Sequence, residues 1–264
     1  MTRKWVNVLR HGILSMCLVL MSWAAFAEIE SDLSEATQST IPPPKLKVSS
    51  WLLMDASTGL TLAAQRADTP VEPASLTKLM TAYVVFREIE RGTVKLDDVV
   101  LVSEKAWRSE GSRMFIEAGD KVQIKNLLMG LIVQSGNDSA VALAEHIAGS
   151  EEGFVDLMNQ TAAELGMANS HFVNSAGMPH PDHYTTARDV TLLTRAIIDQ
   201  QPDHYAMYAI REFTWNDITQ KNRNPLLGRD SSIDGVKTGH TRSAGYCLVG
   251  SAERDGSRLI GTVI

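Results

Sequence analysis

The stretch PASLTKLMTAYVVF, residues 73–86, places one serine and one lysine at the start of a strongly apolar segment. Its apolar residues recur at the i, i+3, i+4 spacing of a buried helix face, which predicts a helix over 76–91. Ser75 and Lys78 lie three residues apart and therefore project from nearly the same side of this helix. A core helix would favour hydrocarbon at both positions, so the pair is a candidate for chemistry.

The Ser75–Lys78 pair could supply a nucleophile and its base. A serine hydroxyl is a weak nucleophile until a neighbouring group removes its proton, and an amine one helical turn away could do so. Burial, a second cation and the helix dipole would each favour the neutral amine. However, S-x-x-K arises by chance about once in a chain of this length. A helix-start serine beside a solvent-reaching lysine is the plain alternative.

Two further motifs follow along the chain. Ser135 and Asn137, separated by a glycine, lie between two apolar-periodic helical segments and could enter one cleft. The alternative is a helix corner in which the asparagine caps the next helix. Lys237-Thr238-Gly239 lies in a late, strand-like segment, where glycine often marks the close approach of a backbone or ligand. The alternative there is an edge strand protected by its lysine.

Residues 1–27 are predicted to be a secretory signal peptide. They carry three basic residues, an apolar run and a small-x-small ending, Ala25-Phe26-Ala27. The run is short for a membrane span, so cleavage is favoured over a retained anchor. Residues 28–47 are polar, end in three prolines and are predicted to form a stiff linker. The mature protein is therefore expected in the periplasm or cell envelope.

Charge and cysteine content limit the possible partners. Removing residues 1–27 takes away three basic residues and no acidic one, which leaves 22 against 31 and a net charge of −9. An acidic surface argues against nucleic acid as a partner. Only Cys247 remains, so no internal disulfide is possible, and stability must come from a hydrophobic core.

Folded structure is predicted to begin at Val48 and to be of the α+β class. A hairpin over 49–65 is followed by a helical middle and then by late strands, with the Asp255-Gly256 turn joining the last two. Strands at both ends enclosing helices favour a mixed sheet with a helical lobe. The sequence stops at Ile264 inside a strand-like segment, so we expect it to be truncated.

The three motifs in this order form the signature of penicillin-recognising serine acyltransferases. PASLTKLMTAYVVF, QSGNDSAVALAEHIAGS, HYTTARD and DGVKTGHTRSAGYCLVGSA resemble the low-molecular-mass penicillin-binding proteins. The chain is most similar to the serine-type D-alanyl-D-alanine carboxypeptidases, over nearly all of 48–264. The resemblance implies a β-lactamase/transpeptidase-like fold and removal of the terminal D-alanine from peptidoglycan stem pentapeptides through an acyl-enzyme. It also implies β-lactams as covalent inhibitors and no cofactor.

The resemblance assigns catalytic roles to residues of the first two motifs. It makes Ser75 the nucleophile, Lys78 its base and Ser135 a proton shuttle toward the leaving group. Asn137 would hold an amide of the substrate, and Lys237 would supply positive potential that helps to keep the base neutral.

Substrate contacts are assigned to the late strand and to one arginine. Thr238 and Gly239 would line the edge strand along which the peptide lies. The backbone N–H groups of His240 and the nucleophile would form the oxyanion hole. Arg223 would bind the terminal carboxylate, for which arginine is well suited. Arg242 is nearer to K-T-G in sequence but is interpreted as a surface residue.

Several alternatives remain open. A D,D-endopeptidase would use the same residues, and a serine β-lactamase would need a further base, for which Glu164 is a weak candidate at the end of a regular helix. His180, Asp182 and His183 invite a zinc site, but H-E-x-x-H is absent, so no metal is expected. A non-catalytic peptidoglycan-binding fragment is also possible. The family often continues into a β-rich domain and a membrane-binding helix, so inner-membrane association would depend on a segment absent from this sequence.

Overall fold

A computed structural model describes residues 42–264, of which Leu46–Ile264 form one compact unit. The predicted signal peptide and most of the predicted linker lie outside the described residues. Within 42–264, no helix is both long and apolar enough to cross a membrane. In chain order the elements are β1 (Trp51–Asp55), β2 (Thr61–Gln65), η1 (Ala74–Leu76), α2 (Thr77–Glu90), β3 (Val99–Leu101), α3 (Glu104–Trp107), β4 (Lys121–Gln123), α4 (Ile124–Met129), η2 (Gly130–Gln134), α5 (Asn137–Ala148), α6 (Glu151–Glu164), α7 (Ala187–Gln200), α8 (Pro202–Tyr205), η3 (Ala206–Ala209), β5 (Glu212–Trp215), β6 (Ile218–Lys221), β7 (Ile233–Thr241), β8 (Gly245–Arg254) and β9 (Ser257–Val263).

A five-stranded sheet joins the two ends of the compact unit, in the order β2-β1-β9-β8-β7. The α+β class is confirmed, but the pairings within this sheet are all antiparallel rather than mixed. The reason is that hairpins join β1 to β2, β7 to β8 and β8 to β9, while β9 returns beside β1 in the opposite direction. As a result β7, which carries the K-T-G motif, lies at an edge of the sheet.

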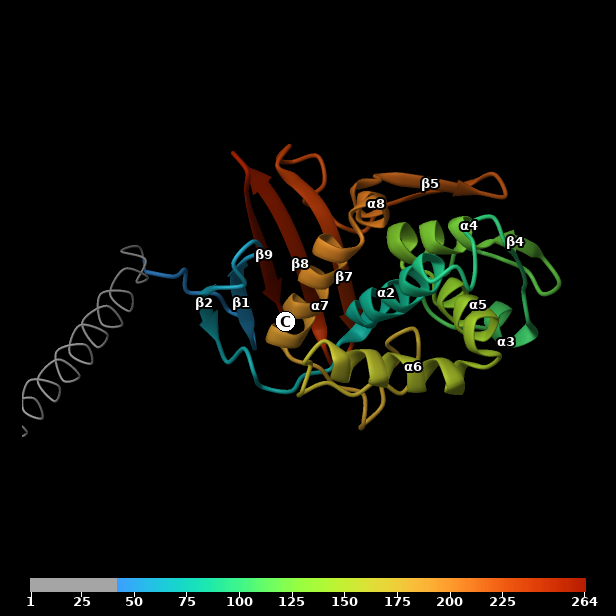
Figure 1. Cartoon of the computed structure of the whole chain (residues 1–264), viewed down its shortest axis with the longest axis horizontal. Coiled ribbons are helices and arrows are strands. Elements are labelled where there is room, and N and C mark those ends of the chain that lie inside the picture. Colours follow the sequence, from blue (N-terminus) through green and yellow to red (C-terminus); the bar gives the residue numbers. More distant parts are fainter. Residues whose placement is uncertain (1–41) are drawn as a thin grey trace, which may run out of the picture. The chain divides into compact units, whose positions relative to one another are not determined.

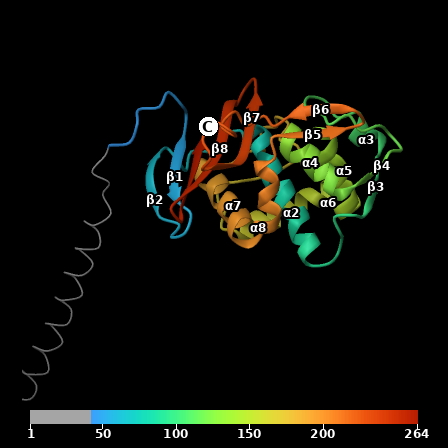
Figure 2. The ribbon, with the colours of Figure 1, turned by 90° about the horizontal axis from the view of Figure 1, so that it is seen from above.

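Helix α2 connects the sheet to the helical lobe. It contacts α5 and α6 in the lobe and α7, which itself packs against β1 and β9 (Figures 1 and 2). Every residue of α2 from Thr77 to Phe86 is buried, which explains why the sequence is so strongly apolar there. The lysine of S-x-x-K is therefore held inside the core.

Two local predictions differ from the structure. The apolar segment over 122–134 begins as a strand, β4, continues as the short α4 and ends in a π-helical turn, η2. The strand expected near 211–216 is β5, but it pairs with β6 in a separate two-stranded ribbon instead of joining the main sheet. The sequence Asn216-Asp217, with both φ angles positive, supplies the tight turn of this ribbon.

Candidate active site

Ser75 lies in a strained turn at the start of α2. It is the middle residue of the 3-10 turn η1, and the preceding Ala74 has a left-handed φ of +46°. The Ala74 carbonyl comes so close to Gly177 that a β-carbon there would lie 1.8 Å from its oxygen. Only glycine fits this contact. The turn thus presents the half-buried Ser75 hydroxyl to the cleft.

The Lys78 amine has three polar neighbours. Nζ lies 3.1 Å from Ser75 Oγ, 2.7 Å from Asn137 Oδ1 and 2.5 Å from the Ala176 carbonyl oxygen. The carbonyl and amide oxygens can only accept hydrogen bonds, whereas the serine hydroxyl can also donate one. A neutral amine has two hydrogens for the two acceptors, and its lone pair then faces Ser75. The geometry thus allows the lone pair of Lys78 to face the Ser75 hydroxyl.

The electrostatic surroundings favour the neutral amine. Burial lowers the pKa of Lys78 well below its ordinary value of 10.5, and the positive charges of Lys237 and Arg223 lower it further. The negative charge of Asp138 opposes this shift but is outweighed. Desolvation is the largest cause, which is the usual way in which a lysine becomes a base at neutral pH.

Lys237 and Ser135 form a second polar pair beside the first. Lys237 Nζ donates to Ser135 Oγ at 2.9 Å and to the Thr238 carbonyl at 2.9 Å. Ser135 has a left-handed φ of +66° at the end of η2, which turns its side chain out of the helical path. Burial, and then the charge of Arg223, lowers the pKa of Lys237 to about 7.

Asn137 is engaged at both ends of its side chain. Besides accepting from Lys78, it donates from Nδ2 to the Glu110 carbonyl at 2.5 Å. The next residue, Asp138, is buried, and its carboxylate accepts from the backbone N–H groups of Met114 and Phe115 at 3.0 and 2.9 Å. The start of α5 therefore fixes both the polar corner and the loop that faces it.

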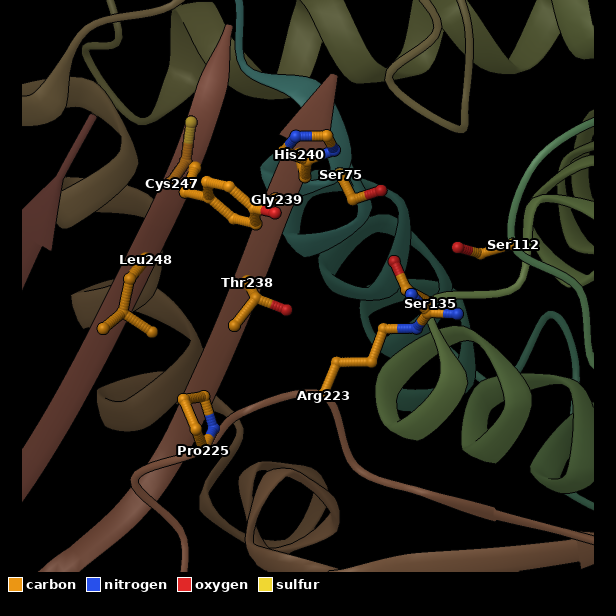
Figure 3. A pocket seen from close by; sticks show the side chains of 11 residues that line it. Ser75, Ser112, Ser135, Arg223, Pro225, Thr238, Gly239, His240, Cys247 and Leu248 are labelled. Atoms are coloured by element: carbon orange, nitrogen blue, oxygen red, sulfur yellow. The ribbon is translucent and has the colours of Figure 1, made fainter. Parts of the chain in front are cut away.

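A cleft of about 600 Å³ opens in front of these side chains (Figure 3). Six predicted site residues line it: Ser75, Ser135, Arg223, Thr238, Gly239 and His240. The close-up shows the Ser75 hydroxyl directed into the space between β7 and the helical lobe, with Arg223 reaching in from the opposite end. Lys78, Asn137 and Lys237 lie just behind the wall, joined to it by the hydrogen bonds above.

Gly239 brings the edge strand against the turn that carries Ser75. A β-carbon at this position would lie 3.3 Å from the Ser75 backbone nitrogen and 3.3 Å from the Pro73 carbonyl oxygen. Any side chain would push β7 away from the turn. The close approach expected for the K-T-G glycine is confirmed, and it places the backbone of β7 beside the Ser75 N–H.

Comparisons with known proteins identify the family of the chain. The sequence model of the D-alanyl-D-alanine carboxypeptidase family matches residues 36–264. The chain belongs to the D-alanyl-D-alanine carboxypeptidase family. Among curated members, DacC of Escherichia coli is 41% identical over 252 residues, which cover 93% of this chain and 63% of DacC. DacD of Escherichia coli is 44% identical, over 84% of this chain and 59% of DacD. The chain thus spans about three fifths of these relatives.

Solved structures of family members share the fold. Penicillin binding protein 5 of Haemophilus influenzae superposes with a TM-score of 0.83 at 40% identity, covering 85% of this chain and 67% of that one. A mutant of the Streptomyces K15 DD-transpeptidase gives a TM-score of 0.77 at 31% identity, over 84% and 91% of the two chains. The β-lactamase/transpeptidase-like fold is therefore confirmed.

The residues considered for a β-lactamase base and for a zinc site lie outside the cleft. Glu164 forms an exposed ion pair with Arg87 at 2.6 Å on the helix surface. His180 and Asp182 are exposed, whereas His183 is buried against Thr77, with 2.9 Å between its Nε2 and the threonine Oγ1. No cluster of three or more metal-ligating side chains occurs among residues 42–264. His183 is buried because its loop folds under α2.

Three site features of this family member were not predicted from the sequence. The Ala176 carbonyl accepts from Lys78 but belongs to the backbone, so no residue type reveals it. Ser112 lines the cleft from a loop with no motif of its own. Tyr246, 85% exposed, contacts His240 with ring centroids 4.3 Å apart and the ring planes tilted by 38°. An exposed aromatic residue shortly after K-T-G could have drawn attention to it.

Proposed function

We propose that this chain is a serine D-alanyl-D-alanine carboxypeptidase that removes the terminal D-alanine from peptidoglycan stem peptides. The observation that carries this proposal is the buried Lys78 amine, held 3.1 Å from the Ser75 hydroxyl, where burial lowers its pKa well below the ordinary value. The family membership and the names of the relatives support the choice of substrate. The proposed catalytic domain comprises residues 48–264.

Acylation begins with proton transfer from Ser75 to neutral Lys78. As the proton leaves, Ser75 Oγ bonds to the carbonyl carbon of the penultimate D-alanine, and the carbonyl electron pair moves to its oxygen. The backbone N–H groups of Ser75 and His240 stabilise this oxyanion, which the close approach at Gly239 supports. Losing one such donor costs about 3 kcal/mol of transition-state stabilisation.

The tetrahedral intermediate then expels D-alanine. The departing amine needs a proton, and Lys78 holds the one taken from Ser75. Ser135 can relay it, since its hydroxyl accepts from Lys237 and remains free to donate its own hydrogen toward the cleft. Water then loses a proton to Lys78 as its oxygen bonds to the ester carbon; the bond to Ser75 Oγ breaks, Ser75 takes that proton from Lys78, and the shortened peptide leaves.

Substrate orientation follows from the two ends of the cleft. Arg223 is exposed in the cleft and carries a permanent charge suited to the terminal carboxylate. Thr238 lines the same end on the edge strand β7, where an extended peptide can add as a further strand. Asn137 would hold an amide of the peptide with its second Nδ2 hydrogen, which otherwise makes only a 3.5 Å contact with Met178 Sδ.

The proposed function also predicts where the protein acts and which compounds inhibit it. We infer that residues 1–27 direct the protein across the inner membrane and that it acts in the periplasm or cell envelope. The curated relatives are bacterial proteins that share this family's domain. β-Lactams, which resemble the acyl-D-alanyl-D-alanine end, would acylate Ser75 and block turnover.

The test is intact mass spectrometry of residues 28–264 after adding benzylpenicillin, followed by an assay for free D-alanine. We expect a long-lived adduct on Ser75 and release of D-alanine from pentapeptide. Ser75→Ala should fold, as judged by circular dichroism, yet form no adduct. Lys78→Arg should be inactive because arginine cannot act as a neutral base. A fleeting adduct with hydrolysed drug would instead indicate a β-lactamase, and a Ser75→Ala adduct would refute the nucleophile.

A further inference from the structure

The 174–178 turn supplies one of the two acceptors that orient Lys78. It connects α6 to the segment before α7 and places the Ala176 carbonyl oxygen 2.5 Å from Nζ. Ala176 is buried, and the contact spans 98 residues of sequence. A backbone carbonyl has no rotamers, so its position is set by the conformation of the turn and by the contacts that stabilise this conformation.

The side chain of Asn174 folds this turn. Its Oδ1 accepts from three successive backbone N–H groups, those of Ala176 at 3.2 Å, Gly177 at 2.7 Å and Met178 at 2.9 Å. Its Nδ2 donates to the Met178 carbonyl at 3.0 Å and lies 3.2 Å from His183 Nδ1. One amide group thus closes the turn from both sides.

We propose that Asn174 is the positioning residue for Lys78. It shapes the 174–178 turn so that the Ala176 carbonyl takes one hydrogen of the neutral amine and the lone pair remains directed at Ser75. This inference rests on the proposed function, since it assumes that Lys78 acts as the base. Nothing in the three catalytic motifs assigns a role to this asparagine.

Neighbouring contacts explain why the turn is a fixed support. Ser175 donates from its backbone N–H and its hydroxyl to Glu151, at 3.0 and 2.7 Å, and its carbonyl accepts from Thr81 at 2.6 Å. Gly177 packs against the Ala74 carbonyl of the nucleophile turn. The same short segment therefore touches both the nucleophile turn and the base.

The charged groups that act on Lys78 come from other elements. Lys237 lies on β7, Asp138 on α5 and Arg223 on the segment after β6, whereas His183 beside the turn is held neutral. Changing Asn174 to alanine leaves these charges in place. If the turn then opens, water reaches Lys78, and the loss of desolvation raises its pKa toward the ordinary value.

The experiment compares Asn174→Ala with a matched control, Asn159→Ala. Asn159 also hydrogen-bonds to the backbone: its Nδ2 donates to the Phe172 carbonyl and its Oδ1 accepts from the Phe172 N–H, both at 2.8 Å. Neither bond involves the 174–178 turn. The acylation rate with benzylpenicillin is measured across pH, and folding is followed by thermal melts. We expect Asn174→Ala to acylate slower on the order of 10²-fold, as for a misplaced catalytic group. Its acid limb should move to higher pH, while Asn159→Ala should lose stability and keep a normal profile.

Two more variants complete the test. Asn174→Asp keeps an oxygen that can accept from the three N–H groups, so its acylation rate at the plateau of the pH profile should recover. Its negative charge should raise the pKa of Lys78 and so move the acid limb of that profile to higher pH. If Asn174→Ala does not fold, Asn174→Ser replaces it, because its hydroxyl reaches fewer of the three amides and should still slow acylation and shift the limb.

The outcomes separate this inference from the proposed function. Asn174→Ala, or Asn174→Ser in its place, acylating with the rate and pH profile of Asn159→Ala would overturn it. So would an Asn174→Asp plateau as low as that of the alanine variant. Wild-type protein that is acylated but releases no D-alanine refutes only the carboxypeptidase activity, and the comparison of variants still decides the role of Asn174. A folded wild-type protein that is never acylated overturns both.

Discussion

Replacing Arg223 by glutamine should erase the preference for substrates that end in a free carboxylate. The guanidinium is held at the cleft by a hydrogen bond from Nε to the Gln134 carbonyl at 2.9 Å, which leaves its terminal nitrogens available. A charge-assisted hydrogen bond to a carboxylate is worth about 1.5–3 kcal/mol. That range corresponds to roughly 10- to 150-fold in kcat/KM.

The assay uses one peptide ending in D-alanyl-D-alanine and the same peptide ending in an amide. The ratio of their kcat/KM values is compared for wild type, Arg223→Gln and the exposed control Arg242→Gln. Any general loss caused by freeing the Gln134 carbonyl affects both peptides and cancels in the ratio. Wild type and Arg242→Gln should discriminate strongly, whereas Arg223→Gln should not. An Arg223→Gln enzyme with wild-type discrimination would refute the reasoning.

Three further predictions concern residues behind the cleft. The pKa of Lys237 is lowered to about 7, so this side chain should lose its charge as pH rises. The turnover rate should therefore fall at alkaline pH, and Lys237→Arg, which stays charged, should remove this fall. An unchanged alkaline fall in the variant would contradict a need for the Lys237 charge. Gly177→Ala places a β-carbon 1.8 Å from the Ala74 oxygen at a φ of +85° and should lower the free energy of unfolding by several kcal/mol in urea titrations, on the order expected for backbone strain. The pKa of buried His183 is lowered to about 4, so the unfolded chain alone binds its proton between pH 4 and 6.5. Stability should therefore fall by up to about 3 kcal/mol as pH drops through that window, a loss that His183→Gln abolishes and His180→Gln does not.

The contact between Ser75 and Lys78 could be predicted from their spacing. S-x-x-K fixes Ser75 and Lys78 on one face of a helix, and the structure sets them 3.1 Å apart. The pairing of Ser135 with Lys237, 102 residues apart, needed the resemblance to a family, since no local rule joins a helix corner to a late strand. The Ala176 carbonyl could not be predicted, because every residue has one and only the tertiary fold selects it.

Long-range pairing also limited the prediction of the fold. Hairpin turns such as Asp255-Gly256 are local signals, and the strands that they join were correctly placed. Whether β1 pairs with β9 in a parallel or antiparallel sense depends on how the chain returns from the lobe, which no local pattern records. His183 shows the same limit at one residue, because a histidine in a polar loop is buried only when that loop folds under a helix.

The three basic side chains of the site differ in burial, and their expected roles differ accordingly. Lys78 and Lys237 are 1% and 3% exposed, whereas Arg223 faces the cleft. Desolvation costs a charged group more the deeper it lies, so the charge is retained most easily at the mouth and least easily beside Ser75. The positive charges of Lys237 and Arg223 lower the pKa of Lys78. A carboxylate bound at Arg223 would offset part of that positive field and raise the proton affinity of Lys78 at the moment when it must accept the proton of Ser75.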